Sequence, residues 1–178
     1  MTAEITGLIE ASSEIHDILK NCPYNVLKQW EIVEFSKGEI LFEQGVIYDS
    51  FCIVLEGRLD IYVMAENSRR YSQAVYKTGN FVGELEIFDR LPFICNVEAL
   101  TPGKLLRLDR EYFLRWLSQD EHFNYHLIQN LCRQFYSLSQ KAGRDTLYPL
   151  KWRIYEYLIN YAEDRRDKRE IFVDKDVL

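Results

Sequence analysis

Six of the eight glycines in this chain lie between residues 38 and 103, where they separate short segments. These segments are rich in β-branched and aromatic residues. Short runs of this kind between turn residues predict the antiparallel strands of a sandwich or barrel. Parallel βαβ winding would need helix-length connections, which this stretch lacks. The predicted strands are residues 31–35, 40–42, 51–55, 59–63, 71–76, 95–100 and 105–108.

Two turns between these strands have recognisable sequences. Glu56-Gly57 predicts a tight hairpin between segments 51–55 and 59–63, because glycine tolerates the positive φ that such hairpins require. The sequence Thr101-Pro102-Gly103-Lys104 predicts a second turn, in which proline presets φ before the glycine.

Helical signals flank the strands on both sides. Residues 5–19 and 23–29 precede them. After them, Asp109 can cap a short helix to Leu117, because its carboxylate can accept hydrogen bonds from unpaired backbone N–H groups. The predicted fold class is therefore α+β, with an antiparallel β-barrel of the jelly-roll kind flanked by helices.

A long helix is predicted from its N-cap Asp120 to about Lys141, with Gly143 as its end. Its main apolar stripe is Phe123, Leu127, Leu131, Phe135 and Leu138. A second stripe, roughly a quarter-turn or more away, is Tyr125, Ile128, Cys132 and Tyr136. A helix that is apolar on two sides can bury one against its own domain and the other against a partner chain. We predict a homodimer with the main stripe in its interface; burial of both sides within one molecule is the alternative.

Pro149 predicts the start of one more helix, which reaches about Ala162. A charged stretch follows, then a short strand at 171–173, and Asp174 resembles the N-cap of a further helix. We expect the chain to be the first part of a longer one. The expected organisation is a helical segment at 1–22, the β-domain at 23–118, a dimerisation helix at 119–143 and an incomplete domain at 144–178.

Composition excludes several classes of protein. Residues 1–118 carry 12 basic and 18 acidic side chains, so this part should repel nucleic acid. The longest uncharged run, His122 to Cys132, has 11 residues, which is too few to span a bilayer. The N-terminus lacks the pattern of a secretory signal. The cysteines form no CxxC pair, so we expect reduced thiols and a cytoplasmic location.

Common catalytic and phosphate-binding motifs are absent from the sequence. His122 and His126 could share a metal on one helix face, but the only other histidine, His16, is remote in sequence. Glu84 and Glu86 would share one face of a strand without an acid–base partner. We therefore expect no enzyme activity, no metal site and no cofactor.

Three blocks resemble the cyclic-nucleotide-binding domain. The first contains FSKGEILFEQG at 35–45 and DSFCIVLEGRLDIY at 49–62, and the last contains VEAL at 97–100 and LRLDREYF at 106–113. Between them, GNFVGELEIFDRLP at 79–92 resembles the phosphate-binding cassette of that family. The match covers about residues 23–140, and the order of elements resembles a Crp/Fnr-type bacterial transcription regulator. This resemblance implies a dimer seam along the long helix and a winged helix-turn-helix after it.

The cassette departs from the family after its proline. Nucleotide-binding members place an arginine there, which neutralises the cyclic phosphate, followed by a small or hydroxyl residue. Here Phe93 and Ile94 occupy these positions, while Gly83, Glu84 and Leu85 match. A buried phosphate without its cation would cost on the order of several kcal/mol. The resemblance thus implies an effector pocket of these five residues that does not bind cyclic nucleotides.

These observations together predict the sensor and dimerisation part of a Crp/Fnr-type transcription regulator. An unknown small-molecule or protein effector would bias the long helix of the homodimer. DNA would bind through the complete C-terminal domain, whose recognition helix is absent from this chain, and no membrane is involved. The alternative is a stand-alone module that binds a protein partner or a small apolar ligand without DNA. An iron–sulfur cluster, used by some Fnr-like relatives, is not expected because only Cys22 precedes the β-domain.

Overall fold

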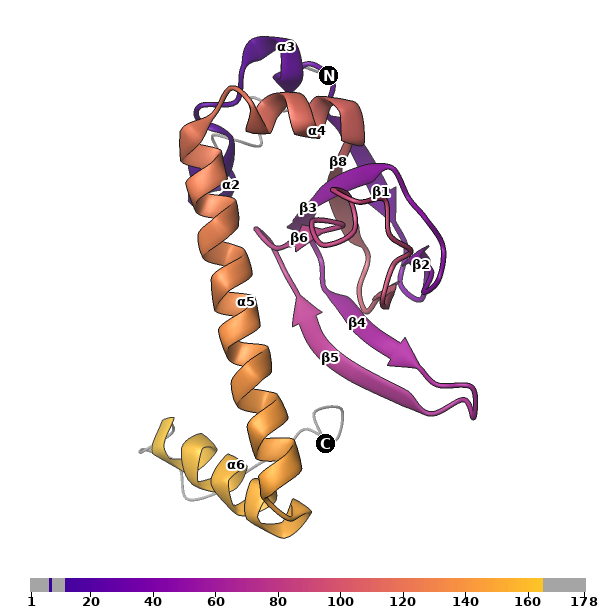
Figure 1. The fold of residues 1–178 in the computed structure, drawn as a ribbon, viewed down its shortest axis with the longest axis vertical. Coiled ribbons are helices and arrows are strands. Elements are labelled where there is room, and N and C mark those ends of the chain that lie inside the picture. Colours follow the sequence, from indigo (N-terminus) through magenta and orange to yellow (C-terminus); the bar gives the residue numbers. More distant parts are fainter. Residues whose placement is uncertain (1–6, 8–11, 165–178) are drawn as a thin grey trace. The chain divides into compact units, whose positions relative to one another are not determined.

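The computed structural model describes residue 7 and residues 12–164. The chain divides into two compact units, one up to His126 and one from Leu127 onward, and each is described by itself. The predicted strand at 171–173 and N-cap at Asp174 lie outside the described residues. In chain order (Figure 1) the elements are α2 (Ser13–Leu19), α3 (Tyr24–Leu27), β1 (Glu31–Phe35), β2 (Ile40–Phe42), β3 (Ser50–Glu56), β4 (Leu59–Met64), β5 (Arg70–Tyr76), β6 (Phe81–Val82), β7 (Asn96–Ala99), β8 (Gly103–Asp109), α4 (Arg110–Leu117), α5 (Glu121–Leu147) and α6 (Leu150–Asp164).

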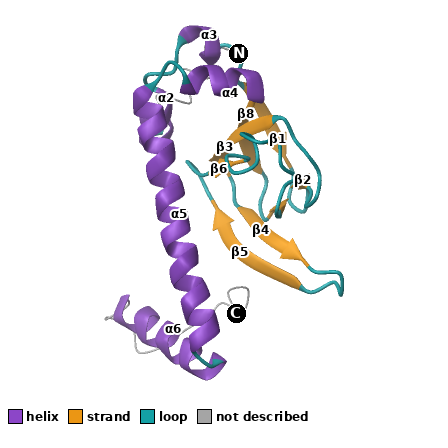
Figure 2. Ribbon diagram, viewed as in Figure 1, coloured by secondary structure: helices purple, strands orange, loops and turns teal. Residues whose placement is uncertain are grey.

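The strands form two four-stranded sheets, in the orders β1-β8-β3-β6 and β2-β7-β4-β5. Every strand pair is antiparallel, and β4 and β5 form a long hairpin (Figure 2). The predicted antiparallel jelly-roll with flanking helices is confirmed, but the two sheets are not closed into a continuous barrel. The sequence pattern does not predict β6, because two residues are too few to show a period.

The hairpin predicted at Glu56-Gly57 is wrong. β3 pairs with β6 and β8, whereas β4 pairs with β5 and β7, so the turn at Gly57 carries the chain from one sheet to the other. The turn before β8 crosses back in the same way. A Cβ added at Gly57 would lie 2.8 Å from the carbonyl oxygen of Pro102, and one at Gly103 would lie 2.1 Å from that of Glu56. The two crossings therefore pack against each other, and neither glycine can carry a side chain.

Two groups of buried residues stabilise the first unit. One of them combines aliphatic side chains from both sheets, such as Val54 and Leu59, with the rings of Phe35, Phe42 and Phe93. The other consists of large, fully buried aromatic side chains from helices, strands and the connection before β1: Trp30, Phe51, Phe81, Phe113, Trp116 and Phe123. Burial of each phenylalanine contributes about 1.5–3 kcal/mol to folding. These aromatic contacts fix α4 and the start of α5 to the sheet that contains β3.

Asp120 joins α4 to α5, as its predicted role of N-cap requires. Its carboxylate accepts a hydrogen bond from the backbone N–H of Phe123 at 3.0 Å and another from the indole N–H of Trp116 at 2.9 Å. The rings of Trp116 and Phe123 stack 3.5 Å apart at 9°. Asp109 precedes α4 as predicted, but its side chain makes no capping hydrogen bond.

The long helix does not end at Gly143, as the sequence predicts, but continues to Leu147. A glycine inside a helix costs only about 1 kcal/mol, which a long helix tolerates. Pro149 is the stronger stop, because its ring disfavours helical φ and ψ at Tyr148, and α6 begins directly after it. Within the described ranges, no helix has both the length and the apolar character that crossing a membrane requires.

Candidate functional site

The five predicted pocket residues lie in segment 83–94, which overlaps the cassette-like sequence 79–92 and is called the cassette from here on. This segment follows β6 and begins at a glycine that cannot be replaced. Gly83 has φ +92°, and a Cβ added to it would lie 2.6 Å from the carbonyl oxygen of Ser50. The following residues form turns, with the backbone N–H of Ile87 donating to the Gly83 carbonyl at 3.1 Å. Pairing of Phe81 and Val82 with β3 places this start beside the sheet.

Phe93 turns inward at the end of the cassette. Its ring is 4% exposed and lies parallel to that of Phe42, with centroids 4.8 Å apart at 4°. The ring of Tyr48 meets it edge-on at 5.2 Å. The position where the family resemblance implies a phosphate-binding arginine is thus occupied by a ring enclosed by two others.

Two carboxyl groups of the cassette itself are buried. Glu84 is 3% and Glu86 7% exposed. The Glu86 carboxylate accepts a hydrogen bond from the backbone N–H of Ile94 at 3.2 Å, but burial outweighs this bond and raises the pKa of Glu86. Burial, followed by the charge of Glu84, raises the pKa of the Tyr76 hydroxyl. These buried groups disfavour an anionic ligand at the cassette, because the carboxylates would repel its negative charge and little water is present to screen it.

Cysteines near the cassette do not provide a reactive thiolate. The thiol of Cys95 donates to the side-chain oxygen of Gln73 at 3.4 Å, and burial raises its pKa to about 11. Burial also raises the pKa of Cys52 to about 12. Both groups are therefore protonated at neutral pH, which fits small buried residues rather than nucleophiles.

The structure brings together only some of the five predicted pocket residues. Gly83, Glu84 and Phe93 are buried, whereas Leu85 is 55% and Ile94 61% exposed. The sequence analysis missed Phe42, Tyr48 and Tyr76, which belong to β2, the loop before β3, and β5. No local spacing could reveal them, because only the sheet topology brings these segments to the cassette.

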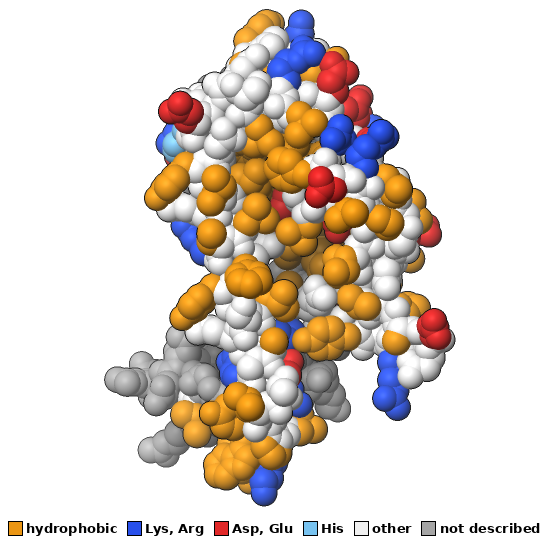
Figure 3. Space-filling model, viewed as in Figure 1, with side chains coloured by type: hydrophobic (Ala, Val, Ile, Leu, Met, Phe, Trp, Pro, Cys, Tyr) orange, Lys and Arg blue, Asp and Glu red, His pale blue; other side chains and the backbone are white. Residues whose placement is uncertain are grey.

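The main stripe of α5 is divided between interior and surface. Phe123 is fully buried in its own unit and Leu127 is buried, Leu131 is half-buried, and Phe135 and Leu138 are exposed. The second stripe is exposed throughout; it comprises Tyr125, Ile128, Cys132 and Tyr136. Figure 3 shows hydrophobic side chains at the surface of the molecule. The predicted dimer interface stays a prediction, and its exposed members are Phe135 and Leu138.

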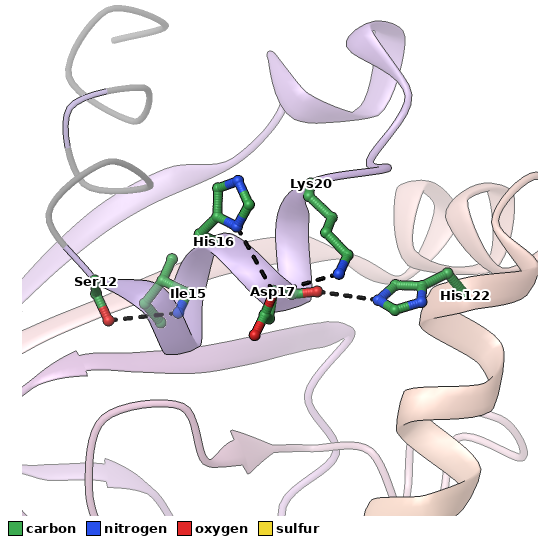
Figure 4. A network of polar contacts seen from close by, with 6 residues as sticks. All are labelled: Ser12, Ile15, His16, Asp17, Lys20 and His122. Atoms are coloured by element: carbon green, nitrogen blue, oxygen red, sulfur yellow. Dashed lines mark hydrogen bonds and ion pairs between the residues drawn. The ribbon is translucent and has the colours of Figure 1, made fainter.

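The histidines make contacts that the sequence does not indicate (Figure 4). Nε2 of His122, on α5, lies 3.2 Å from the carbonyl oxygen of Asp17, on α2, so this nitrogen carries the proton and donates. The Asp17 carboxylate pairs with Lys20 at 3.3 Å, which lowers its pKa, and lies 3.7 Å from Nδ1 of His16. The ring of His126 packs against Phe81. Over the part of the chain that the structure describes, no three His, Cys, Asp or Glu side chains group as metal ligands would.

Comparison with known proteins gives consistent matches. The family model of the cyclic nucleotide-binding domain matches residues 32–120. A CRP-like cAMP-activated global transcriptional regulator from Mycobacterium tuberculosis is 22% identical over 136 residues, which are 76% of this chain and 61% of that protein. This chain therefore spans less than two thirds of that relative.

Solved structures give the same result. A transcriptional regulator from Thermotoga maritima has a TM-score of 0.62 at 26% identity, covering 70% of this chain and 97% of that chain. The c-di-GMP responsive global regulator of Xanthomonas campestris has a TM-score of 0.70 at 17% identity, covering 92% and 76%. The second likeness shows the fold alone. The proteins that this chain resembles are regulators rather than catalysts.

Proposed function

The chain belongs to the cyclic nucleotide-binding domain family, with Crp/Fnr-type transcription regulators as close structural neighbours, and we propose that it is the sensor and dimerisation part of such a regulator. In this proposal, an effector acts on the β-domain, and α5 passes the change to a DNA-binding head. The order of the cassette, α4 and α5 along the chain supports this route. The stand-alone module is not favoured, because the relatives are regulators.

The observation that supports the proposal about the effector class is the place of Phe93. A ring enclosed by Phe42 and Tyr48 leaves no cation at the position after Pro92, and two buried carboxyl groups lie nearby. A charged bidentate pair contributes about 1.5–3 kcal/mol, and leaving its anion unpaired costs more. The effector is therefore not a cyclic nucleotide, although the mycobacterial relative is described as cAMP-activated.

Calorimetry tests this directly. Cyclic AMP, cyclic GMP and c-di-GMP, each titrated to millimolar concentration, should give no binding to the wild-type chain. The double variant Phe93→Arg with Ile94→Ser supplies the missing cation and hydroxyl, and it should gain measurable affinity for a cyclic mononucleotide. Micromolar binding of any of the three nucleotides by the wild type would falsify the proposal.

Homodimerisation is the second part of the proposed function. Exposed apolar side chains on α5, among them Ile128, Phe135 and Tyr136, provide a surface whose burial against a second copy would contribute about 1.5–3 kcal/mol for each large side chain. Two copies would orient two DNA-binding heads, as helix-turn-helix readers of paired half-sites require. The DNA contact itself belongs to the complete regulator, and the expected location is the cytoplasm.

A further inference from the structure

The cassette is anchored at its end by groups of the chain itself. The backbone N–H of Phe93 donates to the Val46 carbonyl at 2.9 Å, and the N–H of Gly45 donates back to the Phe93 carbonyl at 2.8 Å. The next N–H, of Ile94, donates to the buried carboxylate of Glu86. These three bonds fix the backbone at residues 93–94 to the loop after β2 and to the cassette's own acid.

The ring of Phe93 connects this end of the cassette with its start. A Cβ placed on Gly83 would lie 3.4 Å from Cζ of Phe93, so the ring reaches the first cassette residue. On its faces and edges it meets Phe42 and Tyr48. One buried side chain therefore contacts the start of the cassette, strand β2 and the loop before β3 at the same time.

Arg110, the first residue of α4, holds the middle of the cassette. Its Nε donates to the carbonyl of Ile87 at 2.6 Å and its Nη2 to the carbonyl of Phe88 at 2.9 Å. Its backbone N–H donates to the Asp49 carbonyl at 3.0 Å. The ring of Phe88 also packs against Phe113 of α4, with centroids 5.8 Å apart. Cassette and α4 thus share contacts through both a charged donor and an aromatic pair.

A second arginine fastens the last turn of the cassette. Nε of Arg90 donates to the Asp49 carboxylate at 3.0 Å, and its Nη2 pairs with the same carboxylate. Arg90 has φ +53°, a left-handed conformation that a residue with a side chain keeps only when its surroundings hold it. Asp49 therefore binds the cassette through its side chain and α4 through its carbonyl.

We propose that Phe93 acts as a built-in ligand of the cassette and that Arg110 couples the cassette to α4, so that both are held in one arrangement without a bound effector. This inference rests on the proposed function only in treating the cassette as the regulatory segment. In this proposal the Phe93 ring takes the part of a diffusible ligand, because it contacts the start of the cassette at Gly83 as well as Phe42 and Tyr48. Arg110 is a positioning residue, since it acts through the carbonyl oxygens of the cassette.

The first half of the proposal is tested by removing the Phe93 ring and then adding a small aromatic molecule that can fill the space. Phe93→Ala leaves an apolar cavity between Phe42 and Tyr48, and cavities of this kind bind small neutral aromatics. Backbone hydrogen exchange should rise at least about tenfold at 83–94 and at 110–117. Saturating toluene should return both segments to within about twofold of the wild type. Leu91→Ala, at an exposed position of the cassette outside the predicted pocket, should change neither segment.

The coupling is tested with Arg110→Ala, with Arg115→Ala as a matched control. Arg115 lies on the same helix and pairs at the surface with Glu111, so its loss should leave exchange in the cassette unchanged. In the Arg110→Ala background, Phe93→Ala and toluene should still change exchange at 83–94, but the response at 110–117 should be several-fold smaller, because only the contact between Phe88 and Phe113 is left.

Several results would overturn the proposal. Unchanged exchange at 83–94 in Phe93→Ala, or no recovery with toluene, would show that the ring is not a ligand-like element. An equal response of α4 with and without Arg110 would exclude its coupling role. If Phe93→Ala does not fold, Phe93→Leu replaces it, with faster exchange in the same two segments expected and wild-type exchange contradicting the proposal. None of these readouts depends on the calorimetry, so the two proposals can fail separately.

Discussion

The start of α5 and its later turns carry one apolar stripe, but the side chains have opposite surroundings. Phe123 is fully buried and stacks on Trp116, beside the hydrogen bonds of Asp120. Phe135, further along the same stripe, is 73% exposed. The first region belongs to the core of its own unit, and the second offers its apolar side chains to solvent.

The difference shows that helical spacing defines a face without defining what covers it. Burial of a phenylalanine is worth about 1.5–3 kcal/mol wherever it occurs. At Phe123 this energy stabilises the fold. At Phe135 it is available only if another chain covers the helix, which is why the exposed part of α5 favours a dimer.

The largest expected effect is on the free energy of unfolding, when the buried ring of α5 is deleted and the exposed ring serves as the control. Phe123→Ala should lower the free energy of unfolding by about 3–5 kcal/mol, because it leaves a cavity against Trp116. Phe135→Ala should lower it by less than about 0.5 kcal/mol. Urea titration followed by circular dichroism, at a concentration that keeps the chain monomeric, measures both. Equal losses would remove the distinction between the two regions.

Asp120 gives the next largest effect. Asp120→Ala removes the acceptor of both the Phe123 N–H and the Trp116 indole, and should lower the free energy of unfolding by about 1–3 kcal/mol. Asp109→Ala is the matched control, because Asp109 precedes α4 without a capping bond, and it should cost less than about 0.5 kcal/mol. A similar loss in both variants would mean that Asp120 has no special role at the junction.

The exposed region is tested by charge. Phe135→Asp should weaken self-association at least about tenfold, or 1.4 kcal/mol, because a dimer would have to bury the carboxylate. Sedimentation velocity at micromolar concentration should show a dimer for the wild type and for the polar-face control Ser137→Asp. A monomeric wild type, or a dimeric Phe135→Asp, would show that this surface is not the interface.

The smallest effect concerns pH and belongs to the first unit. Burial raises the pKa of Glu86 in the folded state, so its contribution to stability is present below the ordinary carboxyl pKa and is lost as pH rises through the folded value. Glu86→Gln keeps an acceptor for the Ile94 N–H without the charge. It should raise the free energy of unfolding at pH 7 by up to about 1 kcal/mol and leave it unchanged at pH 4. Urea titrations at the two pH values measure this, and a less stable variant at pH 7 would contradict it.

Local sequence predicted much of the fold. Each of the seven predicted strands lies within two residues of its observed bounds, and Asp120 caps α5 as expected. These features depend on neighbouring residues: side-chain alternation, turn residues and a capping carboxylate. The departure at Phe93 was likewise visible from sequence, because the family resemblance places a different residue type there.

Tertiary structure alone decided the rest. The sequence predicted a hairpin at Gly57, but the chain crosses between the two sheets there. The alternation of side chains along a strand does not specify which other strand it pairs with. It placed Phe123 and Phe135 on one face but could not separate core from surface. It gave no sign that Phe93 meets Phe42 and Tyr48, or that Arg110 reaches the cassette. Local propensities set the elements through contacts a few residues apart, whereas these contacts exist only after both sheets and α4 have packed together.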